Sequence, residues 1–245
     1  AKEESINTLL EMAQLKQEGR IQALLAAGCL AQRYREEIQK EIPEVDAILG
    51  TMAIEEICAA VEEVLAGKSK NHYRELNSVP ATYKDRVVTT GGHFAYLKIA
   101  EGCNKRCTYC IIPKVRGDYR SVPMENLVEQ AQVLAQKGVR ELILVAQETT
   151  LYGMDLYGKK SLPLLLHRLA EVEGIRWIRI LYAYPERISD AFIAAMVRNT
   201  KVVPYLDLPI QHCDDAVLKA MNRRGGRKEI EDAIARLRAA IPGIT

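Results

Sequence analysis

The chain has 245 residues, of which 48% are hydrophobic, so it can form one or two domains with sizeable cores. A net charge of +2 gives no electrostatic sign of a nucleic-acid binder, and six cysteines are too few for a disulfide scaffold of this length. The first residues are charged, and no apolar run approaches the ~18 residues of a membrane span. We therefore expect a cytoplasmic protein without a membrane segment.

The first part of the chain alternates between helical and strand-like segments. Three segments have the apolar spacing of helices: 3–18, 33–42 and 54–66. Two short apolar runs are typical of strands buried on both faces: 21–31 and 46–51. This alternation predicts an α/β domain with a parallel sheet. Cys58 follows Ile57 on the third helix, and we expect its thiol in the core.

A change in composition separates this part from the rest. Residues 68–92 are polar, with a possible short strand at 87–90 before two glycines, and we interpret them as a linker. The predicted division is a first domain over 1–67, the linker over 68–92 and a second domain over 93–245.

The second domain repeats a strand followed by a helix. Four segments have strand-like composition: 95–100, 141–146, 177–183 and 205–211. Five segments have helical spacing: 124–137, 163–172, 190–198, 214–222 and 229–240. Four strand–helix units that wind in the same direction favour a β/α barrel or part of one. In such barrels the chemistry lies on the loops after the strands.

Three cysteines follow the first strand of this series. Cys103, Cys107 and Cys110 have the spacing Cys-x-x-x-Cys-x-x-Cys, no fourth cysteine follows closely, and the nearest downstream histidine is His167. Zinc normally takes four ligands, and a ferredoxin uses a different spacing with further cysteines. Three thiolates can hold a four-iron cluster with one iron left open, so this interpretation is favoured over zinc or unliganded thiols.

The cysteine motif, with Tyr109 before its last cysteine, resembles the cluster loop of radical S-adenosylmethionine (SAM) enzymes. The resemblance implies a [4Fe–4S] cluster on the three thiolates, whose open iron chelates SAM. It also implies reductive cleavage of SAM to a 5′-deoxyadenosyl radical, with Tyr109 near the adenine. In such enzymes the cofactor carries the radical chemistry and the protein positions it.

The resemblance extends to the methylthiotransferase family within that superfamily. Four segments carry it: "GCLAQRY" (28–34), "EIPEVDAILGT" (41–51), "EGCNKRCTYCIIPKVRGDYRS" (101–121) and "AVLKAMNR" (216–223). The implied fold is α/β, a partial methylthiotransferase domain followed by a partial radical SAM β/α barrel.

Three further segments resemble one branch of this family: "AQETTLYGMDLYGK" (146–159), "LYAYPERI" (181–188) and "YLDLPIQHCDD" (205–215). That branch adds a methylthio group to the β-carbon of an aspartate in the twelfth small-subunit ribosomal protein. The sister branch, which modifies tRNA adenosine, is the alternative within the enzyme class. A non-catalytic iron–sulfur electron carrier is the alternative of another class.

The resemblance also implies a second cluster. Cys29 corresponds to the third of three cysteines that bind it in the family, and the other two have no counterpart in this sequence. We therefore expect an internal fragment that carries one cluster of the two and is inactive alone. Its barrel is expected to be truncated, without the small carboxy-terminal domain that could contact nucleic acid. An electron donor is an expected partner.

Polar residues at the strand ends are candidates for SAM contacts. By resemblance Gln147, Glu148 and Thr149 face SAM, although solvated loop residues fit the same pattern. Gln211, at the end of the fourth predicted strand, is a further cofactor-binding candidate. Its neighbour His212 fits a capping or core role better.

Several other residues fit either a role in the site or a structural role. Cys213 is read as a structural thiol, and Tyr182 and Tyr184 as packing residues at a strand end. Arg116 and Arg120 could bind a carboxylate bidentately or lie in a solvated loop. The charged turn 222–228 is read as a solvated helix end.

Overall fold

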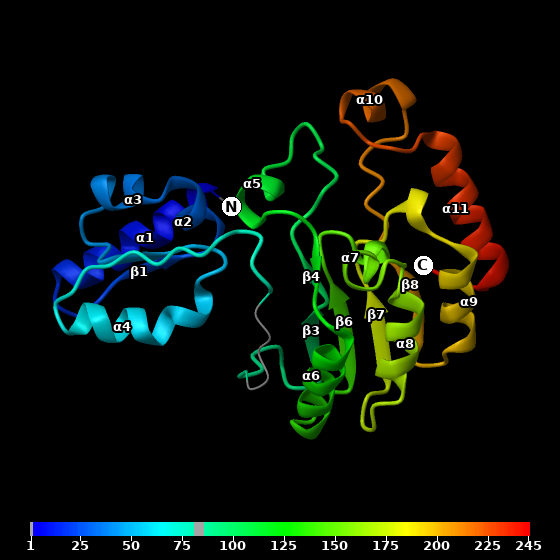
Figure 1. The fold of residues 1–245 in the computed structure, drawn as a ribbon, viewed down its shortest axis with the longest axis horizontal. Helices are drawn as coiled ribbons and strands as arrows, with labels where there is room; N and C mark the ends of the chain where they lie inside the picture. The colour runs from blue at the N-terminus through cyan, green and yellow to red at the C-terminus, as the bar shows by residue number, and fades with distance from the viewer. Residues whose placement is uncertain (1, 81–85) are drawn as a thin grey trace. The chain divides into compact units, whose positions relative to one another are not determined.

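The computed structural model describes residues 2–80 and 86–245. The chain divides into two compact units (Figure 1), and residues 111–117 belong to the first of them although they lie later in the sequence. The first unit comprises 1–81 and 111–117, and the second 82–110 and 118–245. The portion 81–85 of the predicted linker lies outside the described residues. Among the described helices, none has both the length and the apolarity to cross a bilayer.

The first unit has a parallel pair of strands, β1 (Leu25–Ala27) and β2 (Ala47–Leu49). Its helical elements are α1 (Lys2–Gln17), α2 (Cys29–Tyr34), α3 (Glu36–Glu41), the 3-10 turn η1 (Ile54–Glu56), α4 (Ile57–Leu65) and α5 (Ile112–Arg116). Apolar side chains from α1, α3 and the strands form its core, including Ala13, Ile38 and Ile48. Thr51 Oγ1 donates a hydrogen bond of 2.7 Å to the carbonyl of Val115, which joins α5 to this unit.

Local geometry corrects three expectations in this unit. The predicted strand 21–31 is only three residues long, since Gly28 (φ 94°) turns the chain into α2. The predicted helix 33–42 is broken at Arg35, whose φ of 44° is incompatible with a continuous helix. Cys58 is exposed rather than buried, because each residue turns a helix by about 100° and Ile57 and Ala60 face inward instead.

His72 fastens the segment after α4 to β2. Its amide donates to the carbonyl of Ile48 (2.8 Å), and its carbonyl accepts from Gly50 (2.9 Å), so it extends the sheet by one residue. Its buried ring lies between Glu56 (Nδ1–Oε2, 2.8 Å) and Glu63 (Nε2–Oε2, 3.1 Å). His72 is thus bonded to other residues of the first unit.

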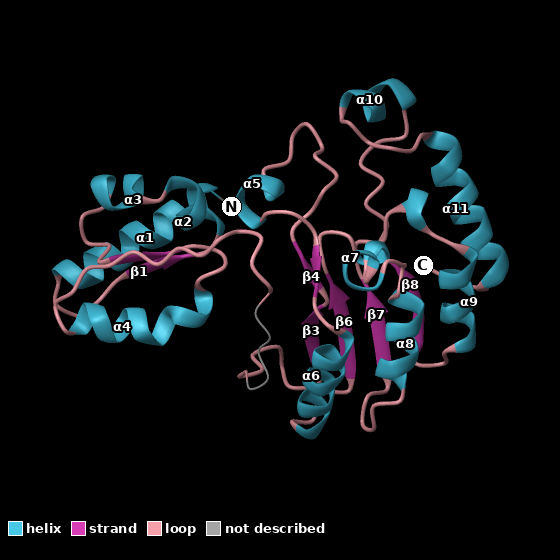
Figure 2. Ribbon diagram, viewed as in Figure 1, coloured by secondary structure: helices cyan, strands magenta, loops and turns pink. Residues whose placement is uncertain are grey.

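The second unit contains a four-stranded parallel sheet in the order β3-β6-β7-β8 (Figure 2). These strands are β3 (Phe94–Lys98), β6 (Glu141–Val145), β7 (Trp177–Ile180) and β8 (Val202–Leu206). The main helices are α6 (Met124–Gln136), α8 (Leu162–Ala170), α9 (Asp190–Arg198) and α11 (Arg227–Ala240). α6 packs against β3, α9 against β8, and α8 against α6 and α9. The predicted series of strand–helix units is confirmed as an open part of a β/α barrel.

Shorter elements complete the second unit. They are the antiparallel pair β4 (Ala100–Glu101) and β5 (Arg120–Ser121), the 3-10 turns η2 (Thr149–Leu151) and η3 (Pro185–Arg187), α7 (Met154–Tyr157) and α10 (Asp215–Ala220). Asp155 of α7 accepts from the amide (2.8 Å) and hydroxyl (2.6 Å) of Ser121. Tyr152, fully buried, donates to the carbonyl of Val122 (2.8 Å). The segment "LYGMDLY" therefore holds the β5 end of the loop that carries the cysteines.

Two strands end earlier than expected. The strand predicted over 177–183 stops at Ile180, because Tyr182 adopts a left-handed conformation (φ 58°). The strand predicted over 205–211 begins at Val202 and ends at Leu206, since Pro209 cannot donate to a sheet ladder and restricts the residue before it. The described residues 87–90 form no strand.

Candidate functional site

The three clustered thiols lie in the loop after β3 and β4, residues 102–110, which we call the cysteine loop. Cys103 and Cys107 are buried and Cys110 is half-buried. The Cys110 amide donates to the carbonyl of Cys107 (3.0 Å), which makes a tight turn between them. Burial raises the pKa of Cys103, and the charges of Glu148, Cys107 and Cys110 raise it further, so the thiols are close enough to interact.

The donor set fits a cluster better than a single ion. Across residues 2–80 and 86–245, no three His, Cys, Asp or Glu side chains are spaced to hold one metal ion. A four-iron cluster requires a wider arrangement of ligands. Each thiolate binds a different iron, so the sulfur atoms stand further apart than the ligands of one metal ion. Three thiols of one loop, of which Cys107 and Cys110 both act on Cys103, provide such ligands.

A group of ion pairs holds the cysteine loop to the ends of two strands. Lys105 pairs with Glu186 after β7 and lies 3.9 Å (Nζ–Oε2) from Glu148 after β6. Arg187 Nε lies 3.3 Å from the other oxygen of Glu148, which also accepts a 3.4 Å bond from Thr150. Burial raises the pKa of Glu148, although Lys105 and Arg187 act to lower it.

Tyr184 is half-buried between two cations. The Nζ of Lys105 lies 3.7 Å from its ring centroid, and the guanidinium carbon of Arg223 lies 4.3 Å from it. Each cation gains a cation–π contact with this ring. Burial raises the pKa of Tyr184, so the phenol is neutral at physiological pH.

The predicted SAM contacts occupy contrasting environments. The Oε1 atom of Gln147 is buried and accepts no hydrogen bond from the described residues, the state expected of an acceptor that awaits a ligand. Glu148 is instead 1% exposed and already held by cations. Tyr109 is 55% exposed beside Cys107. Gln211 lies five residues beyond the end of β8, exposed and with φ 66°, so it is not at the strand end as expected.

Thr149 and Arg120 have structural partners. Thr149 is fully buried, and its hydroxyl donates to the carbonyl of Leu181 (2.8 Å), which ties the loop after β6 to that after β7. Arg120 is buried in β5 and donates to the carbonyl of Asp118.

The remaining candidates are spread between the two units. His212 and Cys213 are exposed beside Gln211, while Arg116 is half-buried in α5 of the first unit. Cys29 is half-buried at the start of α2 in the first unit. The structure therefore brings together the three clustered cysteines with Tyr109 and Tyr184. Glu148 joins them through its charge interaction with Cys103.

Sequence reasoning missed the cations of this site. Lys105 lies inside the cysteine motif, but a lysine between cysteines has no distinctive pattern, and its partners Glu148 and Glu186 lie more than 40 residues away. Arg223 was assigned to a solvated helix end, whereas its side chain packs on Tyr184. The available signal was its position in the turn that follows α10, close to a helix end.

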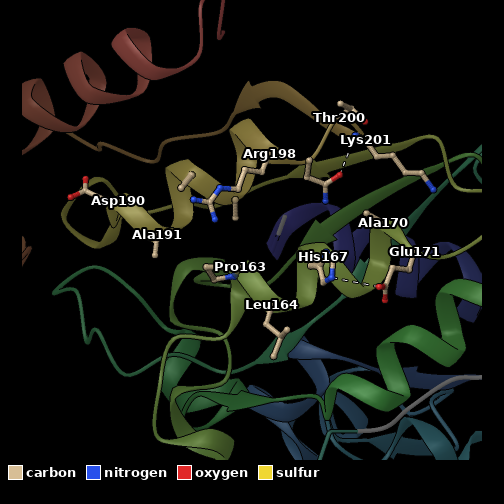
Figure 3. Close-up of a pocket in the computed structure, with 13 residues that line it drawn as sticks. Pro163, Leu164, His167, Ala170, Glu171, Asp190, Ala191, Arg198, Thr200 and Lys201 are labelled. Carbon is tan, nitrogen blue, oxygen red and sulfur yellow. Dashed lines mark hydrogen bonds and ion pairs between the residues drawn. The ribbon is translucent and has the colours of Figure 1, made fainter.

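The groove shown in Figure 3 is separate from these residues. It has a volume of about 920 Å³ and lies between α8 and α9, lined by side chains such as Leu164, His167 and Arg198. His167 and Glu171 form an exposed pair across one helical turn, 3.5 Å apart (Nε2–Oε1). The groove holds no cysteine, so its size does not identify the reactive centre.

Two family models match the chain, and one of them covers the cysteine loop. Residues 97–245 match the family model described as the radical SAM superfamily, and residues 1–50 match the one described as uncharacterized protein family UPF0004. The chain is 55% identical over 244 residues to the ribosomal protein uS12 methylthiotransferase RimO of Lachnoclostridium phytofermentans, covering 100% of this chain and 56% of that protein. It is 49% identical to the RimO protein of Acetivibrio thermocellus over 251 residues, covering 100% of this chain and 55% of that protein. The chain thus spans little more than half the length of these relatives.

Solved structures share the fold at low sequence identity. The radical S-adenosylmethionine methyltransferase TsrM from Kitasatospora setae, with tryptophan substrate and a SAM analogue bound, superposes with a TM-score of 0.70 at 11% identity. This match covers 96% of the chain and 51% of TsrM. The cobalamin-dependent S-adenosylmethionine radical enzyme OxsB superposes with a TM-score of 0.64 at 11% identity, over 96% of the chain and 37% of OxsB.

The family follows from the extent of the first match. The matched region includes the end of β3, the cysteine loop and the other three strands of the parallel sheet, which is the part that brings the three thiols together. Because it covers more than half of the chain, the chain belongs to the radical SAM superfamily.

Proposed function

We propose that the chain is part of a radical SAM methylthiotransferase whose substrate is ribosomal protein uS12. The observation that carries this proposal is the cysteine loop, with three interacting thiols at the carboxyl end of the first strand of a parallel β/α sheet. Relatives at 55% and 49% identity bear the name of that enzyme. The substrate position is an aspartate β-carbon, as the sequence resemblance implies.

The cluster is assigned to Cys103, Cys107 and Cys110, with SAM on the open iron. The bound cluster and SAM supply one-electron cleavage of SAM and hydrogen abstraction. Gln147, with its unpartnered buried oxygen, is the residue here that best suits a hydrogen-bond donor of SAM. Tyr109 is assigned to the adenine. Gln211 and Glu148 stay predictions as SAM contacts.

The proposed reaction replaces one hydrogen of the substrate carbon with a methylthio group. One SAM provides the methyl group, a second takes the hydrogen as 5′-deoxyadenosine, and an external donor provides the electron. The sulfur comes from an acceptor on a second cluster, to which Cys29 contributes one ligand. The division into domains at 67 and 93, like the second cluster and the electron donor, remains a prediction.

The test is a reaction with both alternative substrates. The full-length protein that contains this chain is reconstituted anaerobically and given SAM, a reductant, uS12 and unmodified tRNA. We expect mass spectrometry to find one methylthio group in place of one hydrogen on a uS12 aspartate, and none with Cys107→Ala. Modified tRNA beside unmodified uS12 would support the tRNA branch instead, and SAM-independent electron transfer alone would support an electron carrier.

A further inference from the structure

The turn after α10, residues 221–223, is hydrogen-bonded to the cysteine loop over more than 110 residues of sequence. The Thr108 amide donates to the carbonyl of Met221 (3.2 Å), and its hydroxyl donates to the carbonyl of Ala220 (3.2 Å). Asn222 Nδ2 donates to the carbonyl of Arg106 (2.9 Å). Three hydrogen bonds therefore fix the cysteine loop between Cys103 and Cys110.

Both sides of this contact have unusual backbone geometry. Arg106 has a φ of 53° and Asn222 a φ of 57°, which is the left-handed region. Such a conformation costs a residue other than glycine of order 1–3 kcal/mol and persists only where its surroundings enforce it. Asn222 follows the C-cap of α10, where asparagine takes this conformation readily, and the Arg223 amide there donates to the carbonyl of Leu218 (2.9 Å). The costly conformation is that of Arg106, whose carbonyl accepts the hydrogen bond from Asn222, which indicates that this contact helps to set the shape of the cysteine loop.

Arg223, the last residue of the turn, extends toward the thiols. Its Nη2 donates to the carbonyl of Pro209 (2.8 Å), while its Nη1 is buried without a partner among the described residues. The guanidinium also interacts with the thiol of Cys107 and stacks on Tyr184. A buried N–H group without a partner is rare, and it suits an acceptor that gains negative charge when the site is filled, such as the sulfur of Cys107 as a thiolate.

Arg223 and Lys105 differ in the groups that compensate their positive charges. Lys105 is paired with the carboxylates of Glu186 and Glu148. The hydrogen-bond and stacking partners of Arg223 are a carbonyl and a neutral ring, and Glu186 acts on it through charge without an ion pair, so its charge is less compensated than that of Lys105. Of the two, Arg223 is better able to act on the charge of a neighbouring cluster.

We propose that Arg223 is a positioning residue that places a positive charge and an N–H donor against the sulfur of Cys107 when this thiolate holds a cluster, while Asn222 sets the shape of the loop. This inference rests on the proposed cluster site. The potential of an iron–sulfur cluster depends on nearby charge and on hydrogen bonds to its sulfurs. Reduction adds negative charge, so Arg223 raises the reduction potential of the cluster and makes the cluster easier to reduce.

The experiment is a redox titration of the anaerobically reconstituted protein, followed by electron paramagnetic resonance. In Arg223→Gln we expect the reduction potential to shift to more negative values at an unchanged iron content, and in Arg223→Lys to shift less. The control is Arg224→Gln, which removes the same charge from the exposed neighbouring residue and is expected to keep the wild-type potential. Asn222→Gly keeps the left-handed backbone but loses the bond to Arg106, so iron should load more slowly at the wild-type potential.

The outcomes separate this inference from the proposed function. A wild-type protein that holds no four-iron cluster would contradict the cluster site itself. The role of Arg223 would be overturned if the wild-type protein holds a cluster but Arg223→Gln does not shift its reduction potential. A shift no larger than that of Arg224→Gln would overturn it as well. Should Arg223→Gln fail to load iron, Arg223→Lys decides, since an unshifted potential in that variant overturns the proposal as well.

Discussion

The cysteine loop and the segment that bears Cys29 both follow the first strand of a parallel sheet, yet their surroundings differ. The cysteine loop contains three thiols and is bound by side chains from the loops after β6, β7 and α10. Cys29 is a single half-buried thiol where β1 passes into α2. Its segment is held mainly through its neighbour Gln32, whose Oε1 accepts from the Thr51 amide (3.1 Å).

The difference indicates that one site is preformed and the other is not complete in itself. Contacts distant in sequence hold the cysteine loop, so we expect its thiols to be ordered before a cluster binds. A four-iron cluster normally takes three or four thiolates, and Cys29 alone could offer only one. The predictions below test this contrast, from the largest expected effect to the smallest.

Removing any one thiol of the cysteine loop should have the largest effect. Reconstitution of the wild-type chain should give about four irons per chain, the content of one cluster. We expect Cys103→Ala, Cys107→Ala and Cys110→Ala to lose this iron and the associated visible absorption, since each thiolate holds a separate iron.

Cys29→Ala and Cys213→Ala are the matched controls, and both should keep the iron of the cysteine loop. Iron and labile sulfide analysis measures the content. A full iron content in a variant that lacks all three clustered cysteines would contradict the contrast between the cysteine loop and the Cys29 segment. Loss of iron in Cys29→Ala would contradict it as well.

Breaking the ion pairs behind the cysteine loop should destabilise the second unit. Lys105→Met leaves Glu148, whose side chain is 2% exposed, without one of its two cations. Loss of one partner from a buried pair typically costs about 3–5 kcal/mol of unfolding free energy. Denaturant unfolding followed by circular dichroism measures the change.

The control for Lys105→Met is Lys228→Met. Its exposed pair with Asp232 spans one turn of α11, with side chains 82% and 59% exposed. Exposed pairs of this kind contribute about 0.3–0.5 kcal/mol. Equal effects of the two substitutions would show that the ion pairs of the cysteine loop are no more important than surface ones.

The position of Cys29 depends on the fold of the first unit, which His72 stabilises. Its ring bonds both Glu56 and Glu63, and it is 6% exposed. His72→Ala should lower the unfolding free energy of the first unit by about 1–3 kcal/mol, because buried polar partners lose their bonds. His167→Ala, at an exposed site, serves as the control. Amide hydrogen exchange of β2 in each variant measures the loss, and unchanged protection in His72→Ala would contradict this role.

The smallest effect is a pH dependence from Glu148. Burial raises its pKa in the folded chain, so the folded state binds a proton that the unfolded state releases. The stability from this group is fully present below its unfolded pKa of about 4.3 and is lost as pH rises through the folded value. Glu148→Gln should remove this slope from the unfolding free energy, and an unchanged slope in the variant would assign the pH dependence to other groups.

The cysteine motif and the parallel series could be predicted from sequence because both are local patterns. Cys103, Cys107 and Cys110 lie within eight residues, and β3, β6 and β7 are short, mostly apolar runs. The cations around the thiols could not be predicted in this way, since Lys105 and Arg223 acquire their roles only through partners distant in the chain.

Errors in the fold have local causes of another kind. The left-handed conformations of Arg35 and Tyr182 end a helix and a strand at residues that normally continue them. Cys58 has apolar neighbours in sequence, but the face of α4 that packs is turned away from it. Apolar periodicity indicates that a face is buried, but it does not resolve the boundary of that face to a single residue.

The most direct test of the account is the effect of SAM on the electron paramagnetic resonance spectrum of the reduced cluster. The account predicts that SAM changes the spectrum of the wild-type protein, because one iron of a cluster on Cys103, Cys107 and Cys110 is open to a ligand. It further predicts that Cys29→Ala shows the same change. A four-iron cluster whose spectrum is identical with and without SAM, in a protein that also forms no 5′-deoxyadenosine, would contradict it.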